Sequence, residues 1–570
     1  MFYSCIPLPT REANPVSDID VILNKIVNPI LSGFHPDPVI CRCGEDYYIA
    51  TSTFEWFPGV RIFHSRDLQN WRLVSRPLDR ISQLDMKGNP DSGGIWAPCL
   101  SYADGQFWLL YTDVKVVNAP WKNGRNYLVT AKDITGPWRE PVPMGNGGFD
   151  PSLFHDADGR KYYLYRKWGP RHHSNPENHI LLQEYFPQEQ KLSNQRVRLF
   201  SGTHRKLTEG PHIYKRGDFY YLVVAEGGTV YQHACTVARS KDLFGPHQLH
   251  QLHPDETIVT TEHAPENALQ KAGHASLVRT HTGEWYMAYI VGRPIVLARQ
   301  QMPDGMRGYC PLGRETAIDK LYWQDDWPYA VGGQHAKTQV DAPDMAIQEW
   351  QTSEHFIDDF EDTDLNPEWQ TLRIPFNQEI GQLIPEESLL RLYGKDSLVS
   401  LFTQATVARR WQHFHFEANT QLSFYPENDQ QTAGLTCYYN TLNWSYCFVD
   451  FDEELACRTI KLIQVDKGEA SYYLYQQPIV IPDTAENIWL KVSVQLATYQ
   501  YSYSFDGIQW HVIEQELPAW KLSDDYVSGK GFFTGAFVGL HCADISADGC
   551  YADFHRFEYF PHARRPQQLR

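Results

Sequence analysis

The chain has 570 residues and a formal net charge of −18 at pH 7, and its length favours two or more domains over a single core. With 42% hydrophobic and 21% charged residues, its composition is typical of a folded globular protein rather than a disordered one. The negative charge argues against nucleic acid or an anionic membrane as a partner, because either would be repelled. No apolar run approaches the ~20 residues that span a bilayer.

The N-terminal sequence MFYSCIPLPTREANP lacks the basic start and the apolar stretch of a secretory signal. The 11 cysteines are scattered and contain no CxxC pair, which favours free thiols in a reducing compartment. We therefore expect a cytoplasmic protein whose substrate is small enough to be imported. Residues 1–25 are expected to form an N-terminal extension, to which no role is assigned.

Five copies of an aromatic-rich strand pattern organise residues 26–335. Each copy follows a turn signal and has the period-two alternation of a strand. The copies are EDYYIATS from Glu45, GQFWLLYT from Gly105, GRKYYLYR from Gly159, GDFYYLVVA from Gly217 and GEWYMAYIV from Gly283. Repeats spaced by roughly 55–65 residues are typical of units that stack radially as propeller blades.

A second pattern precedes each aromatic strand, and it contains the candidate functional residues. The copies are HPDPVI around Asp37, WAPCL at Trp96, DPSLF at Asp150, EGPHI at Glu209 and GHASL at His274. If the repeats are blades, these five residues occupy one register and surround the mouth of one channel. A single Asp-Pro is usually only a turn, but a propeller core position is normally apolar. Three acids at matched positions therefore predict a shared site.

The repeat stops near residue 335. The stretch VGGQHAKTQVDAPDMA is rich in Gly, Pro and polar residues, which predicts a linker over residues 336–355. From residue 356 to 570, short alternating segments such as GLTCYYN and YSYSFDGIQWHVI predict antiparallel strands joined by turns. The expected fold is therefore all-β, with a five-bladed β-propeller followed by a β-sandwich of the jelly-roll, concanavalin-like type.

A ring of carboxylates beside aromatic residues points to sugar chemistry. The sequence contains no dinucleotide fingerprint, phosphate-binding loop, zinc-protease motif or serine nucleophile elbow. Glycoside hydrolysis needs one carboxylic acid to protonate the leaving oxygen and one carboxylate to act at the anomeric carbon. A third acid raises the pKa of the proton donor by placing negative charge beside it.

The same motifs resemble glycoside hydrolase family 43, and most closely its two-domain β-xylosidases. The resemblance runs from NPILSGFHPDPVI through GFDPSLFHD, LTEGPHIYK and CPLGRETA to GFFTGAFVGL. It implies an inverting reaction in which Asp37 is the general base and Glu209 the general acid. Asp150 would orient that acid and tune its pKa.

The resemblance also implies a substrate pocket around the acids. Phe54 in STFEW and Trp96 in IWAP resemble walls of the terminal xylose subsite, whereas His274 and Arg314 match pocket positions and Phe533 reaches the pocket from the second domain. Without the resemblance, the aromatic residues and the histidine would be interpreted as core residues and the arginine as a surface charge. The implied partner is a xylooligosaccharide, with assembly into a homo-oligomer, either dimer or tetramer. No cofactor is required, although the family allows a divalent cation such as Ca²⁺ near His274.

An inverting pair leaves room for water, so the carboxyl groups of Asp37 and Glu209 are expected roughly 6.5–9.5 Å apart. A pocket closed at one end would release terminal xylose. Three alternatives remain open at this stage: an α-L-arabinofuranosidase or dual-specificity enzyme, a carbohydrate-binding protein without turnover, and a propeller that serves only as an interaction scaffold.

Overall fold

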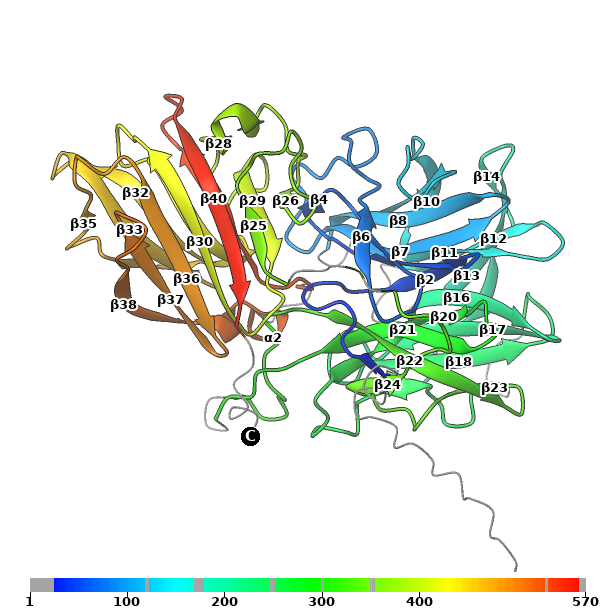
Figure 1. The fold of residues 1–570 in the computed structure, drawn as a ribbon. Helices are drawn as coiled ribbons and strands as arrows, with labels where there is room; N and C mark the ends of the chain where they lie inside the picture. Colours follow the sequence, from blue (N-terminus) through cyan, green and yellow to red (C-terminus); the bar gives the residue numbers. More distant parts are fainter. Residues whose placement is uncertain are drawn as a thin grey trace, which may run out of the picture.

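The computed structural model describes residues 25–117, 122–168, 179–245, 252–298, 302–348, 350, 354–527 and 532–562. Within these ranges the protein is all-β, and its only α-helix is the four-residue α2 (Asp524–Val527). A propeller and a sandwich lie side by side (Figure 1). The fold class expected from the sequence is confirmed.

Each blade is an antiparallel sheet built from successive strands. The first blade contains β2 (Val39–Cys43), β3 (Asp46–Thr51), β5 (Arg61–Ser65) and β6 (Arg72–Ser75). The second contains β7 (Gly94–Ala103), β8 (Gln106–Val116), β9 (Asn123–Ala131) and β10 (Val142–Asn146). The third contains β11 (Gly148–His155), β12 (Lys161–Lys167), β13 (Ile180–Phe186) and β14 (Lys191–Leu192), with β15 (Val197–Phe200) also paired to β13.

The last two blades have the same order. The fourth contains β16 (Glu209–Arg216), β17 (Phe219–Glu226), β18 (Ala234–Ser240) and β19 (Val259–Thr260). The fifth contains β20 (Gln270–Arg279), β21 (Trp285–Gly292), β22 (Glu315–Gln324) and β23 (Trp327–Ala330).

The five aromatic repeats are the second strands of the five blades, namely β3, β8, β12, β17 and β21. These strands are buried along most of their length rather than on alternate residues. Since each blade packs between two others, both faces of its central strands are covered, and large aromatic side chains fill the space between blades. The turn-plus-aromatic signal therefore marks the most enclosed strand of each unit.

The first strands of the blades form a closed ring. β2 contacts β7, β7 contacts β11, β11 contacts β16, β16 contacts β20, and β20 contacts β2. Outside this ring, β1 (Lys25–Val27) pairs with β24 (Gln339–Asp341), and the side chain of Asn28 bonds to Ile318 and Lys337 of the fifth blade region. A strand therefore lies within the stretch expected to be a linker, and it ties the two ends of the propeller together.

The second domain consists of two packed sheets. One contains β27 (Gly381–Ile384), β28 (Leu389–Tyr393), β40 (Tyr551–Pro561), β30 (His415–Phe424), β36 (Ile488–Gln495), β37 (Thr498–Ser504) and β38 (His511–Pro518), with β25 (Phe356–Asp358) on β40. The other contains β34 (Glu469–Tyr473), β33 (Cys457–Asp466), β32 (Asn443–Asp452), β31 (Gln431–Asn440), β39 (Phe537–Asp544), β29 (Ala405–Arg410) and β26 (Gln370–Leu372), with β35 (Ile479–Val480) on β33.

The last strand of that second sheet comes from the propeller half of the sequence. β4 (Trp56–Phe57) pairs with β26, so the edge of the sandwich is completed by a segment between β3 and β5. The Trp56 ring stacks on Phe537 with ring centroids 3.7 Å apart, and both side chains are fully buried. Figure 1 shows β4 beside β26. The two domains consequently share a hydrogen-bonded sheet, and side chains of both contribute to one hydrophobic core.

No helix among the described residues is long and apolar enough to cross a membrane.

Candidate active site

A left-handed residue interrupts the start of every blade. The residues are Asp37, Ala97, Asp150, Gly210 and His274, with φ between 27° and 58°. In the last four blades this residue and the one after it form a bulge in the pairing of the first two strands, and in the first blade Asp37 and Pro38 directly precede β2. A bulge changes the direction of the side chains around it. The feature recurs in the first strand, or directly before it, in all five blades, where these strands form the closed ring.

The structure corrects one expectation from the sequence, namely that the five candidate residues occupy the same position in every blade. Asp37, Asp150 and His274 are the left-handed residues of their blades, but Trp96 and Glu209 precede the left-handed residue by one position. Alignment on the X-Pro step would have placed Ala97 and Gly210 beside Asp37 and Asp150. Two side chains of the ring therefore leave the strand one residue earlier than the other three.

Asp37 lies in an environment that favours its ionised form. Its carboxylate accepts hydrogen bonds from Arg314 Nη1 at 2.7 Å and Ser52 Oγ at 2.6 Å, and His274 Nδ1 is 3.5 Å from Oδ1. Burial alone raises the pKa of Asp37, but the positive charge of Arg314, together with the hydrogen bonds from Ser52 and Arg314, brings it below the ordinary value. Asp37 is therefore a buried carboxylate, charged at neutral pH.

Asp150 lies in the opposite environment. Burial, followed by the negative charges of Glu209 and Asp37, raises the pKa of Asp150 well above its ordinary value. Its Oδ2 accepts a hydrogen bond of 2.9 Å from the backbone N–H of Gly210, the residue after Glu209. The backbone of the fourth blade is thereby attached to a carboxyl group of the third. Two neighbouring acids that cannot both ionise at low cost retain a proton between them.

Arg166 holds the side chain of Glu209. Its Nη1 lies 2.6 Å from Glu209 Oε2, and the arginine side chain is almost fully buried. Arg166 lies opposite Phe149 in the β11–β12 pairing, one residue before Asp150. Its guanidinium also lies over the Phe149 ring, 4.8 Å from the centroid. The pairing of β11 with β12 thus positions both Asp150 and Arg166, the partner of Glu209.

Lys122 is a second cation beside Glu209. Its ammonium group lies 4.9 Å from the Trp96 ring centroid, 5.3 Å from that of Phe149 and 4.5 Å from that of Trp168. Burial lowers the pKa of Lys122 to about 8, with Glu209 opposing the shift and Arg166 adding to it. The aromatic faces and Glu209 stabilise the ammonium group in this enclosed position.

Gly210 and His274 pack too closely for any other residue at position 210. A Cβ added at Gly210 would lie 2.5 Å from His274 Nε2, and the backbone there has a φ of +58°. Both constraints require glycine. The imidazole of His274 is thereby held between Gly210 and Asp37.

The histidines near the axis do not fit a Ca²⁺ site. Burial lowers the pKa of His274, and it lowers those of His212 and His233 to about 3, so all three are neutral imidazoles. Ca²⁺ prefers six to eight oxygen ligands. Among the described residues, no group of three or more His, Cys, Asp or Glu is arranged to hold a metal ion.

Three aromatic rings from both domains form one wall of the site. Phe54 lies 6.1 Å from Trp96 and 6.0 Å from Phe533, and Trp96 and Phe533 are 5.4 Å apart, edge to face. The guanidinium of Arg314 lies over Phe54 and Phe533, and Arg314 Nη2 donates to the carbonyl oxygen of Phe533 at 3.4 Å. A residue of the sandwich therefore contacts the arginine that binds Asp37.

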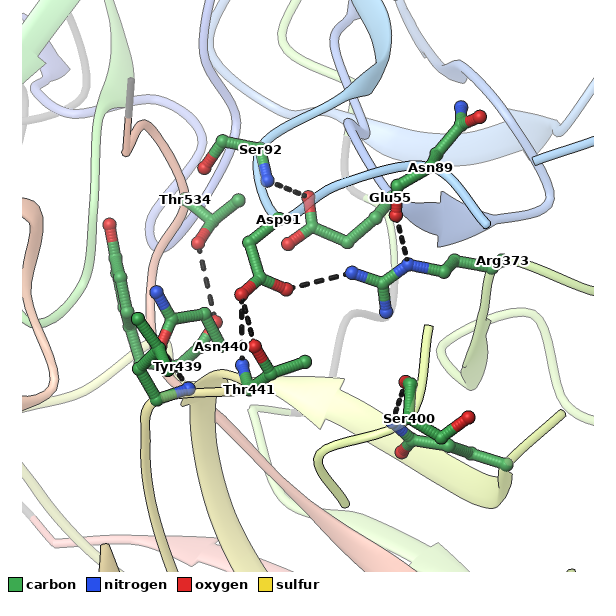
Figure 2. Close-up of polar contacts among 12 residues, drawn as sticks. Glu55, Asn89, Asp91, Ser92, Arg373, Ser400, Tyr439, Asn440, Thr441 and Thr534 are labelled. Atoms are coloured by element: carbon green, nitrogen blue, oxygen red, sulfur yellow. Dashed lines mark hydrogen bonds and ion pairs between the residues drawn. The ribbon is translucent and has the colours of Figure 1, made fainter. Parts of the chain in front are cut away.

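A buried polar network supports this wall (Figure 2). Ser92 Oγ accepts a hydrogen bond from the backbone of Phe533, and the Ser92 carbonyl accepts one from Trp96 Nε1. Behind Ser92, its backbone N–H donates to Glu55 at 3.1 Å. Burial raises the pKa of Glu55 to about 8, with Arg373 opposing the shift.

Asp91 connects this network to the sandwich. It accepts hydrogen bonds from Arg373 Nη2 at 2.7 Å and from the backbone and hydroxyl of Thr441 (Figure 2). Arg373 also donates to the Asn89 carbonyl. Residues from both domains therefore fix the position of the aromatic wall.

The structure brings all eight residues singled out from the sequence into one cluster. Asp37, Asp150, Glu209 and His274 meet at the ring of first strands, and Phe54, Trp96, Arg314 and Phe533 surround them. Sequence reasoning missed Arg166, Lys122, Phe149 and Trp168. Arg166 carried a usable signal, since it directly follows the aromatic run Tyr162–Tyr165 of the repeated strand. Lys122 carried no such signal, because it lies in a loop before β9.

A five-bladed propeller with three acids in its ring of first strands, completed by a concanavalin-like sandwich, defines a class of two-domain glycoside hydrolases. The family model "Glycosyl hydrolases family 43" matches residues 26–328, and "Beta xylosidase C-terminal Concanavalin A-like domain" matches residues 357–560. The chain belongs to glycosyl hydrolase family 43.

Its relatives match over nearly the full chain. A provisionally named β-xylosidase of Escherichia coli (strain K12) is 63% identical over 538 residues, covering 94% of this chain and 100% of that protein. A β-xylosidase of Bacillus subtilis (strain 168) is 55% identical over 540 residues, covering 94% and 99%. The crystal structure of a xylan β-1,4-xylosidase from Bacillus halodurans C-125 superposes with a TM-score of 0.89 at 46% identity, covering 94% of this chain and all of that one.

Proposed function

We propose that the protein is an exo-acting, inverting β-xylosidase that releases xylose from the non-reducing ends of β-1,4-xylooligosaccharides. The observation that carries the proposal is the contrast between two acids. Arg314 keeps Asp37 ionised, whereas Asp150 retains a proton beside Glu209. An ionised carboxylate suits the general base, and the raised pKa of Asp150 marks the opposite side of the site, where the more accessible Glu209 is the proton donor. The names of the similar proteins support xylose as the sugar.

In the proposed reaction, Asp37 removes a proton from the attacking water. Its lowered pKa keeps it unprotonated, and Arg314 and Ser52 fix its two oxygens. Because Arg314 also contacts Phe533, the same guanidinium connects the base to the aromatic wall. Water would attack one face of the sugar while the leaving group departs from the other, which inverts the anomeric configuration.

Glu209 gives a proton to the departing oxygen. Its side chain is partly accessible, whereas Asp150 is buried, so Glu209 is the member of the pair that reaches a substrate. Asp150 contributes by raising the cost of removing the proton from the pair and by holding the Gly210 amide. Arg166 keeps the Glu209 carboxyl in one orientation.

The aromatic wall supports exo cleavage. Phe54, Trp96 and Phe533 provide apolar faces on which a pyranose ring can pack, and Phe533 enters from the sandwich side. We propose that this wall, completed by the second domain, closes one end of the sugar site, so that a terminal residue fits and a continuing chain does not. We further propose that the two carboxyl groups suffice without a cofactor, since glycoside hydrolysis needs only acid–base chemistry.

We also propose a cytoplasmic location and assembly as a dimer or tetramer. The ten cysteines within the described residues are all free, which suits a reducing compartment. The assembly is proposed from the family resemblance and is tested by sedimentation.

Proton NMR of the purified protein with xylobiose tests the proposal. α-Xylose should appear before mutarotation, which would demonstrate both substrate and inversion. β-Xylose appearing first would overturn inversion, and cleavage of arabinofuranosides in place of xylobiose would establish the alternative activity. A protein that retains xylobiose without cleaving it would be a binding protein.

Two variants assign the acids. Asp37→Ala and Glu209→Ala should each abolish xylobiose hydrolysis and leave the fold intact by circular dichroism. Glu209→Ala should keep more activity on aryl xylosides with good leaving groups, which need less protonation. Equal losses on good and poor leaving groups would remove Glu209 from the role of acid.

A further inference from the structure

Three arginines are buried together where the propeller meets the sandwich, away from the acids of the active site. Arg61 belongs to β5 of the first blade, and Arg409 and Arg410 are adjacent residues of β29. Their exposed fractions are 1%, 3% and 3%. Arginine is rarely buried to this extent unless its charge is paired.

Most of their hydrogen-bonding capacity is unused. Arg61 Nη2 donates to Glu368 Oε2 at 2.8 Å, Arg409 Nη2 to Gln412 Oε1 at 2.6 Å, and Arg410 Nε to the Phe34 carbonyl at 2.7 Å. The remaining nitrogens are Nε and Nη1 of Arg61, Nε and Nη1 of Arg409, and both Nη atoms of Arg410. These six buried atoms have no hydrogen-bond partner among the described residues. Buried donors without partners are costly, so such a group indicates a missing acceptor.

The charges are equally unbalanced. Among the described residues, Glu368 is the one carboxylate that forms an ion pair with any of the three arginines, and its partner is Arg61. Arg409 and Arg410 therefore contribute two positive charges that no carboxylate pairs. Burial, followed by Arg61, lowers the pKa of Arg410 well below its ordinary value. His35 lies beside the arginines and adds no charge to the group. Burial, followed by the charges of Arg410 and Arg61, lowers the pKa of His35 well below its ordinary value, so its imidazole is neutral.

There is space next to the cluster. Glu368 is partly accessible, with 33% of its side-chain surface exposed, although it contacts the fully buried Arg61. A surface pocket begins beside it, lined in part by Pro58, Arg76 and Pro367. Burial, followed by the charge of Arg61, lowers the pKa of Arg76, so this residue of the pocket lining is the one through which the pocket adjoins the cluster.

We propose that this arginine cluster binds a small inorganic oxyanion of the phosphate or sulfate type. Paired guanidinium nitrogens match the oxygens of a tetrahedral oxyanion, and charge-assisted bonds of this kind are the strong ones. A doubly charged oxyanion would offset the excess positive charge and supply acceptors for the four free nitrogens of Arg61 and Arg410. Water would supply acceptors but leave the charge uncompensated.

The site lies directly behind the substrate pocket. Arg410 lies over the rings of Phe34 and Phe537, 5.7 and 5.4 Å from their centroids. Phe34 in turn contacts Phe54 of the aromatic wall, with ring centroids 5.7 Å apart. The bound anion therefore stabilises the interface that positions the wall, and it does so whichever sugar the enzyme cleaves.

Thermal unfolding of the full-length protein tests the proposal. After exhaustive dialysis into an anion-poor buffer, the Tm should rise with the logarithm of added phosphate or sulfate, and chloride at matched ionic strength should have no such effect. Arg61→Met and Arg410→Met should abolish the rise. Arg410→Met removes a buried charge that has no carboxylate partner, so it should be no less stable than the parent in the anion-poor buffer, whereas Arg61→Met also breaks the ion pair with Glu368 and should be less stable there. Arg160→Met, which changes an exposed arginine, is the matched control and should respond like the parent.

Ion chromatography of the denatured parent protein provides a measurement that does not depend on the variants. One phosphate or sulfate per chain should be released from protein that was exposed to the anion and then washed. If no anion is released and the Tm does not respond to phosphate or sulfate, the arginines are solvated by water alone and the proposal is wrong. An equal rise with chloride would also overturn it, because a monatomic ion would then suffice.

Discussion

Replacing Arg166 with methionine should raise the pH at which the enzyme loses activity on the alkaline side. Arg166 Nη1 lies 2.6 Å from Glu209 Oε2, and its charge also opposes the raised pKa of Asp150. A nearby arginine lowers a carboxyl pKa by about one to three pH units, equivalent to about 1.4–4 kcal/mol. Without Arg166, Asp150 should keep its proton to a pH higher by up to about that amount.

The assay is the pH profile of kcat/KM for xylobiose, which reports the essential groups of the free enzyme. The acid limb, assigned to Asp37, should stay in place because Arg314 and Ser52 hold that carboxylate. The parent and Arg166→Met are also compared with Lys122→Met added to both, because Lys122 itself titrates at about 8 and would otherwise contribute to the alkaline limb. Arg205→Met, which breaks another arginine–glutamate pair with Glu262, is the control. An alkaline limb that stays in place or moves down in folded Arg166→Met protein would refute the reasoning.

The pKa of Glu55, about 8, lies above that of an unfolded glutamate, so its contribution to stability is complete below about pH 4.5 and is lost as pH rises to about 8. Glu55→Gln should therefore flatten this decline in chemical denaturation and exceed the parent at pH 8, whereas a less stable variant at that pH would contradict the assignment. Asp91→Asn leaves Arg373 without its carboxylate and should lower the free energy of unfolding by about 3–5 kcal/mol at pH 7; a loss below 1 kcal/mol would count against the pair. Gly210→Ala forces a Cβ against His274 and should reduce kcat/KM for xylobiose by about 100-fold or more, so near-normal kinetics would show that the close contact is dispensable. Phe533→Ala removes one face of the pocket wall and should raise KM about tenfold or more, from a loss of about 1.5–3 kcal/mol of apolar contact, and an unchanged KM would exclude Phe533 from the sugar site.

The blades could be predicted because each repeats a turn followed by an aromatic strand, and that signal is local. The acids could be found because they recur at one place in the repeat. Their register could not be assigned correctly at Trp96 and Glu209, since the X-Pro bulge shifts the side chains by one residue and the motif alone does not say which residue is left-handed.

Other features depend on contacts between distant parts of the chain. β4 has only two residues, Trp56 and Phe57, and it becomes a strand because β26 pairs with it. Lys122 lies in a loop, so no periodicity marks its approach to Glu209. The separation of the Asp37 and Glu209 carboxyl groups stays a prediction, and the inverting mechanism awaits the NMR experiment.

The pairing of β4 with β26 has a consequence for biosynthesis. About 300 residues separate the two partners, and ribosomes add about 5–20 residues per second, so the Trp56 segment is made roughly 15 to 60 seconds before its partner leaves the ribosome. During this interval the nascent chain exposes an apolar edge that only a later part of the same molecule can cover. A truncated gene encoding the first domain alone would make that exposure permanent, and its product should aggregate rather than persist as a smaller enzyme.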